Sequence, residues 1–156
     1  MKFKKTDPDN ILKILKDFSS YEEFLLWTGN KFSYPIKEEE FLSYLDNVSN
    51  LQSLSFFVNN ELIGYGEITR IKEDSASISR LLILNNFRSK GYGKVLIKTI
   101  IDYAFDEFNL KELTLNVIES NEKAIKLYEY YGFEKIKNSH YKINNDLKGF
   151  MMTKIL

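Results

Sequence analysis

Apolar residues recur at three- and four-residue intervals over the first fifty positions of the chain, a spacing typical of amphipathic helices. The signal Asp7-Pro8-Asp9 marks a helix start, and Gly29 marks a helix end. We therefore expect a short edge strand followed by three helices in this part, over 2–4, 7–18, 21–27 and 36–48.

Beyond position 50 the pattern changes to short apolar runs and alternating positions, which predict strands. The predicted strands cover 54–58, 62–71, 75–84, 113–118, 133–137 and 149–155. Two further helices are predicted over 95–108 and 121–131. An antiparallel meander followed by a strand–helix–strand order predicts an α+β fold with a mixed sheet, in which a right-handed crossover makes 113–118 parallel to 75–84.

Length and composition predict one folded domain. The chain has 156 residues, of which 44% are hydrophobic, enough to build a core. Lys and Arg (22) balance Asp and Glu (22), so no net charge favours nucleic acid or membrane, and neither is expected as a partner. No apolar stretch has the length of a membrane span and the first residues lack an apolar signal core, so a cytoplasmic location is expected.

The absence of cysteine restricts the chemistry. The sequence allows no disulfide, no cysteine-type zinc site and no cysteinyl acyl intermediate. The single histidine, His140, excludes a site with several histidine ligands, so no metal is expected. We expect His140 to be a solvated turn residue.

The most informative segment is Arg88-Ser89-Lys90-Gly91-Tyr92-Gly93-Lys94, between a predicted strand and a predicted helix. The free N–H groups and the dipole of a helix N-terminus favour an anion, and glycine lets a ligand approach the backbone. A P-loop would need Ser or Thr where Val95 stands, and a dinucleotide fingerprint would need Gly where Leu96 stands. Neither motif is therefore present.

The remaining pattern, Arg-x-x-Gly-x-Gly, resembles motif A of the GNAT superfamily of acyl-CoA-dependent N-acyltransferases. The segment 121–133, Asn-x-x-Ala-x-x-Leu-Tyr-x-x-x-Gly-Phe, is similar to motif B of that superfamily. The resemblance covers about 54–138. It implies a central mixed, mostly antiparallel twisted sheet flanked by helices, in a single domain 1–156. Within it, 1–50 would form variable acceptor-side helices and 54–138 the acetyl-CoA-binding core.

The resemblance implies acetyl-CoA as co-substrate and assigns residues to it. Backbone N–H groups at the strand end would polarise the thioester carbonyl, at Leu81, Leu82 and Ile83. The loop would hold the diphosphate, through Arg88, Ser89, Lys90, Gly91, Tyr92, Gly93 and Lys94. Asn121 would face the cofactor, and Tyr128 would donate a proton to the departing sulfur. The alternative for Tyr128 is a core aromatic residue.

The base that deprotonates the amine is less clear from the sequence. Some relatives that acetylate protein N-termini carry glutamate on the strand before motif B, and the matching residue here is Asn116, which cannot accept a proton at neutral pH. Glu67 is the candidate, because the resemblance places its strand beside the acceptor. The alternatives are a solvated carboxylate at Glu67, a water chain, or Glu119.

The acceptor side offers only aromatic and acidic residues without a motif. Trp27, Phe32, Tyr34 and Pro35 lie where the family places an acceptor lid, although core packing explains aromatics equally well. Glu38, Glu39 and Glu40 form an acidic cluster at a predicted helix start. The helix dipole favours acidic residues there, which is a sufficient structural explanation for the cluster.

The functional prediction is transfer of an acetyl group from acetyl-CoA to a primary amine, by direct attack within a ternary complex. The acceptor would be a small-molecule amine or a peptide. The alternatives are a protein N-terminal or lysine acetyltransferase and a catalytically silent acyl-CoA sensor. Dimers in the family make a homodimer one expected assembly.

Overall fold

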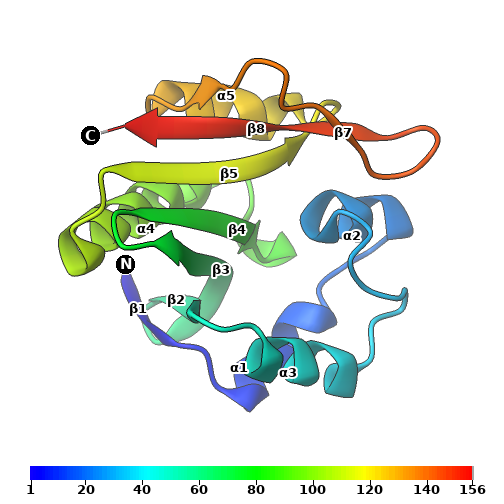
Figure 1. Cartoon of the computed structure of the whole chain (residues 1–156). Helices are drawn as coiled ribbons and strands as arrows, with labels where there is room; N and C mark the ends of the chain where they lie inside the picture. Colours follow the sequence, from blue (N-terminus) through cyan, green and yellow to red (C-terminus); the bar gives the residue numbers. More distant parts are fainter. Residues whose placement is uncertain (156) are drawn as a thin grey trace.

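An eight-stranded sheet runs through the computed structural model, which describes residues 1–155 (Figure 1). The strands are β1 (Lys2–Lys5), β2 (Leu51–Val58), β3 (Glu61–Lys72), β4 (Ser75–Ile83), β5 (Glu112–Ile118), β6 (Glu134–Lys135), β7 (Tyr141–Lys142) and β8 (Lys148–Ile155). Their order is β1-β2-β3-β4-β5-β8-β6, with β7 also paired to β8. Every strand pair is antiparallel except β4 and β5, which confirms the mixed, mostly antiparallel sheet.

Five α-helices accompany the sheet within the described residues. They are α1 (Pro8–Leu15), α2 (Tyr21–Thr28), α3 (Glu38–Asn47), α4 (Tyr92–Phe108) and α5 (Glu122–Tyr130). Several predicted boundaries were wrong by a few residues. The first helix ends at Leu15 rather than at position 18, and the strand predicted from position 54 begins at Leu51. The third helix begins at Glu38, after the N-cap Lys37, rather than at position 36. The fourth begins at Tyr92, because Gly91 takes a left-handed conformation (φ +83°) and serves as the N-cap. Strand β7 was not predicted.

Two hydrophobic cores lie on opposite faces of the sheet. Successive residues at the end of β4 alternate between them, as a strand requires: Leu81 packs with one core and Leu82 with the other. Helices α4 and α5 cover the first face, and α1, α2 and α3 cover the second (Figure 1).

Two glycines on β3 let α4 pack closely on the sheet. A Cβ at Gly64 would lie 2.6 Å from the Leu82 carbonyl oxygen and 2.9 Å from Leu96 Cδ1. A Cβ at Gly66 would lie 3.0 Å from Ile100 Cδ1. Leu96 and Ile100 lie one turn apart on α4. The two glycines therefore leave room for these side chains where the helix crosses β3.

Strands β4 and β5 separate part-way along their length. They pair only from Ser75–Ile78 to Glu112–Leu115, after which β5 continues beside β8. In β4 the register against β3 shifts between Ser79 and Leu82, and Arg80 takes a positive φ of 48°. This bulge, together with the missing β5 partner beyond Ile78, opens the sheet between the two parallel strands.

Candidate functional site

A cavity of about 110 Å³ occupies the split between β4 and β5. Its walls come from these two strands, from α2 and from one side of α5. It is lined by Leu26, Trp27, Ile78, Ser79, Arg80, Leu81, Leu115, Asn116, Val117, Ile118, Asn121, Ala124 and Tyr128. We call it the split cavity.

A larger cavity of about 460 Å³ adjoins it on the side of α2 and β7. It is lined by Leu26, Trp27, Thr28, Gly29, Lys31, Ser79, Arg80, Asn116, Ile118 and Tyr141. Six residues line both cavities, among them Ser79, Arg80 and Asn116. We call it the outer cavity, and the two cavities meet at this shared wall.

Tyr128 lines the split cavity and is chemically suited to donate a proton there. Burial raises the pKa of its phenol to about 12, so the hydroxyl is protonated at neutral pH. Its ring meets Phe133 edge-on, with centroids 6.0 Å apart, which fixes its orientation. Asn121 lines the same cavity, but as the N-cap of α5, where its Oδ1 accepts a hydrogen bond from the Ala124 N–H.

The predicted carbonyl-polarising residues take different positions. Leu81 lines the split cavity, on the stretch of β4 that lacks a partner on the β5 side. Leu82 is buried in the core beneath α1–α3 and pairs with Tyr65. The carbonyl of Ile83 accepts a hydrogen bond from Arg88 Nε at 2.7 Å. Only Leu81 of the three therefore reaches the cavity.

The glycine loop forms an open N-terminus for α4. Gly91 is the N-cap and no side chain caps the helix, so its first N–H groups are available to a ligand. A Cβ at Gly91 would meet no atom within 4 Å, and one at Gly93 would meet only Leu127 Cδ2, at 3.9 Å. The residues present therefore fit a diphosphate that approaches the backbone.

The charged side chains of this loop are only partly available to an anion. Arg88 forms ion pairs with Glu23 and, at 3.6 Å, with Asp17, so it connects the loop to the α1–α2 region. Lys90 donates to the Asn86 carbonyl at 2.8 Å. Lys94 Nζ lies 5.2 Å from the ring centroid of Tyr130. The backbone, more than Arg88, is the feature suited to phosphate.

Glu67 is fully buried, so the alternative of a solvated carboxylate was wrong. It forms an ion pair with Arg80 and accepts hydrogen bonds from Tyr65 Oη (2.7 Å), Tyr44 Oη (2.8 Å) and Ser79 Oγ (3.3 Å). Burial and then the Glu67 charge raise the pKa of Tyr44 and of Tyr65. Glu67 lines neither cavity, but its partners Ser79 and Arg80 line both.

The other predicted residues are dispersed. Glu119 lies in a half-exposed pair with His140, 3.2 Å from its Nε2. Trp27 lines both cavities and donates from Nε1 to the Arg80 carbonyl at 2.7 Å. Phe32 is buried against Phe41 and Tyr44. The four aromatic-loop residues therefore do not form one lid.

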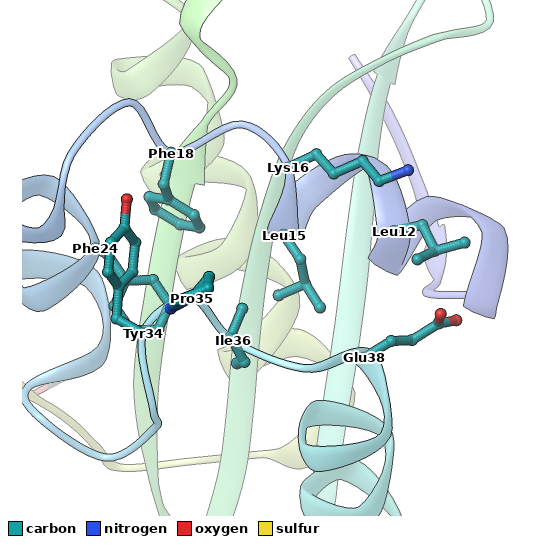
Figure 2. A pocket seen from close by; sticks show the side chains of 9 residues that line it. All are labelled: Leu12, Leu15, Lys16, Phe18, Phe24, Tyr34, Pro35, Ile36 and Glu38. Carbon is teal, nitrogen blue, oxygen red and sulfur yellow. The ribbon is translucent and has the colours of Figure 1, made fainter.

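Tyr34 and Pro35 line a separate pocket of about 280 Å³ between α1, α2 and the start of α3 (Figure 2). Figure 2 shows Leu15, Phe18 and Ile36 around it, with the side chains of Lys16 and Glu38 at one end. None of the predicted cofactor or catalytic residues lines this pocket.

Sequence reasoning missed several lining residues of the outer cavity, among them Lys31, Ser79, Arg80 and Tyr141. A signal existed for Arg80, because it is the one charged residue in the mostly apolar run Ile78–Leu84. Lys31 and Tyr141 lie in segments without a motif, so their approach to β4 is a property of the fold.

The model of the acetyltransferase (GNAT) family matches residues 17–133. The chain belongs to the GNAT family. It is accordingly an acetyl-CoA-dependent N-acetyltransferase.

Several relatives are similar to this chain. A spermine/spermidine N(1)-acetyltransferase of Bacillus subtilis is 25% identical over 112 residues, 67% of this chain and 74% of that protein. The ribosomal protein bS18-alanine N-acetyltransferase of Haemophilus influenzae is 32% identical over 84 residues, 54% of this chain and 56% of that protein. The crystal structure of spermidine N-acetyltransferase from Vibrio cholerae, in complex with CoA and spermine, superposes with a TM-score of 0.80 and 21% identity, covering 99% of this chain and 94% of that one.

Residues 1–155 lack two further kinds of feature. No helix there is long and apolar enough to cross a membrane. No group of three or more His, Cys, Asp or Glu side chains could hold a metal ion in that part of the chain.

Proposed function

We propose that this acetyltransferase acts on the primary amine of a small molecule, by direct attack within a ternary complex. The observation that carries the proposal is the shared wall of the two cavities. The split cavity holds the predicted acid Tyr128, and the outer cavity, beyond Ser79, Arg80 and Asn116, has room for a small acceptor. An amine bound in the outer cavity and a thioester bound in the split cavity would be in reach of each other. The transfer would then need no covalent enzyme intermediate.

In this proposal the chain supplies binding, polarisation and proton transfer. The N-terminus of α4 at Gly91–Gly93 binds the diphosphate of acetyl-CoA. The unpaired edge of β4 near Leu81 directs a backbone N–H at the carbonyl oxygen. The neutral amine forms the new N–C bond, the C–S bond breaks, and Tyr128 gives its proton to the departing sulfur. The phenolate then recovers a proton from solvent.

The excess proton on the nitrogen needs a base, and Glu67 stays the predicted one. It has no direct access to either cavity, so the proton would pass through Ser79 Oγ, which lines both cavities and lies 3.3 Å from Glu67 Oε2. The ion pair with Arg80 stabilises the buried carboxylate. Bound water leading to solvent is the alternative route.

Release of free thiol from acetyl-CoA, measured across an amine library, tests the proposal, and mass spectrometry identifies the acetylated product. The expected result is thiol release that depends on a small amine. Release with N-terminal peptides but not with small amines would instead support protein N-terminal acetylation, which the similarity to the bS18-alanine enzyme favours. Binding of acetyl-CoA with no release for any amine would support a silent sensor and contradict the proposal.

A further inference from the structure

The outer cavity carries positive charge that the chain as a whole lacks. The only Lys, Arg, Asp or Glu side chains in its lining are Lys31 and Arg80, so within residues 1–155 no carboxylate forms its wall. Glu67, behind Arg80, offsets one of the two charges. The adjoining surface pocket beside Tyr141 adds Lys142 and Lys148 against the single carboxylate of Glu119. Since the chain has 22 basic and 22 acidic residues, this excess is local.

Both cations are held in place by the same aromatic ring. Arg80 Cζ lies 4.6 Å and Lys31 Nζ 4.5 Å from the ring centroid of Tyr44. Burial, followed by the charge of Arg80, lowers the pKa of Lys31. Like charges over one ring repel, and a bound anion would relieve that repulsion.

One hydrogen-bond donor of Arg80 also lacks a partner in the part of the chain that the structure describes. Its bonds to Tyr44 and Ser79 and its contact with Glu67 all come from Nη2. Nε is buried and has no hydrogen-bond partner among residues 1–155. Buried donors in native proteins are nearly always paired, and this unpaired donor belongs to a residue that lines both cavities.

We propose that the acceptor amine carries an anionic group, a carboxylate or a phosphate, which binds beside Lys31 and Arg80. This inference rests on the proposed function, because it names the acceptor class of the same site. It separates this chain from the relatives named for spermine and spermidine: a polyamine, which is cationic along its length, would meet two cations and no carboxylate in the wall of the outer cavity.

Matched acceptor pairs test the inference directly. Thiol release from acetyl-CoA is measured with 4-aminobutyrate against putrescine, and with O-phosphoethanolamine against ethanolamine. The anionic member of at least one pair should have a kcat/KM at least about tenfold higher, as expected where a charged group finds or lacks its partner. The pair with the larger ratio distinguishes carboxylate from phosphate. Preference for putrescine and ethanolamine would overturn the inference.

A charge-reversal variant links the preference to the cavity. Lys31→Glu should reduce the kcat/KM ratio of each anionic compound to its partner compound at least about fivefold. Lys72→Glu changes an exposed lysine at the far end of the β3–β4 hairpin and should leave that ratio unchanged. Arg80 is unsuitable for this test, because its removal would leave Glu67 buried without a counter-ion. An equal ratio in the Lys31→Glu and parent enzymes would contradict the assignment.

Calorimetry separates this inference from the proposed function. The same four compounds are titrated into the protein loaded with coenzyme A, which measures acceptor binding without turnover. No thiol release with any amine would contradict the proposed function, while the calorimetric ranking would still test the charge preference. Tighter binding of the anionic members supports the inference, and equal or weaker binding opposes it.

Discussion

The proposed cofactor side and the proposed acceptor side of this protein are built in different ways. The cofactor side uses backbone features of two continuous segments, the open N-terminus of α4 and the capped start of α5. The acceptor side is assembled from side chains of α2, the following loop, β4, β5 and β7. A backbone feature needs particular residues at particular spacings, so it leaves a motif. A cavity assembled from distant side chains does not.

Breaking the buried network on the acceptor side should have the largest effect. Glu67→Gln leaves Arg80 without its buried counter-ion, and we expect a loss of about 3 kcal/mol in the free energy of unfolding. Urea unfolding followed by circular dichroism measures it. The half-exposed pair partner Glu119 provides the control, since Glu119→Gln should cost less than about 1 kcal/mol. Equal stabilities for the two variants would show that the network is not structural.

The same variant tests the base, at a temperature where it remains folded. If Glu67 accepts the proton, Glu67→Gln should lower turnover at neutral pH and recover partly at high pH, where more of the amine is already neutral. A pH–rate profile parallel to that of the parent enzyme would remove Glu67 from the reaction and leave water as the proton acceptor.

On the cofactor side, Tyr128→Phe should lower turnover by about 10- to 100-fold and leave coenzyme A affinity nearly unchanged. The change removes the phenol hydroxyl and keeps the ring that packs on Phe133. Tyr130→Phe is the matched control, because Tyr130 is 71% exposed on the same helix and lines neither cavity. If Tyr128→Phe turned over as fast as the parent enzyme, Tyr128 would be a core aromatic residue without a catalytic role.

A substitution in the glycine loop should weaken the binding of coenzyme A without lowering the stability of the protein. Gly93→Ala should weaken coenzyme A about tenfold in calorimetry, because its methyl group enters the space open to the ligand. The variant should be at least as stable as the parent, since alanine favours helix over glycine by about 1 kcal/mol. Gly91→Val, the more obvious variant, would also strain a backbone at φ +83°. Unchanged affinity in Gly93→Ala would remove the loop from the diphosphate site.

The smallest expected effect concerns the dependence of turnover on pH. Because burial raises the pKa of Tyr128 to about 12, the acid form persists well into the alkaline range. Turnover should therefore rise as the amine loses its proton and should not decline below about pH 10. A falling limb centred near neutral pH in the parent enzyme, absent from Tyr128→Phe, would contradict this assignment of the pKa.

Most of the fold followed from periodicity, and the motif over 121–133 located Asn121 and Tyr128, which the structure brings to one cavity. The bulge at Arg80 was not predictable, because its positive φ depends on the register between β3 and β4 and not on a local turn sequence. The burial of Glu67 was missed for a similar reason: its partners Tyr44 and Arg80 come from α3 and β4. Long-range side-chain assembly thus accounts for most of what the sequence did not reveal.

In the proposed reaction the acetyl group passes directly from a thioester in the split cavity to an amine in the outer cavity. Initial velocities measured while both acetyl-CoA and an accepted amine are varied test this direct transfer. We expect intersecting double-reciprocal lines and no thiol release without amine, as a ternary complex requires. Parallel lines, together with an acetylated enzyme detected by mass spectrometry, would show a covalent intermediate and contradict it.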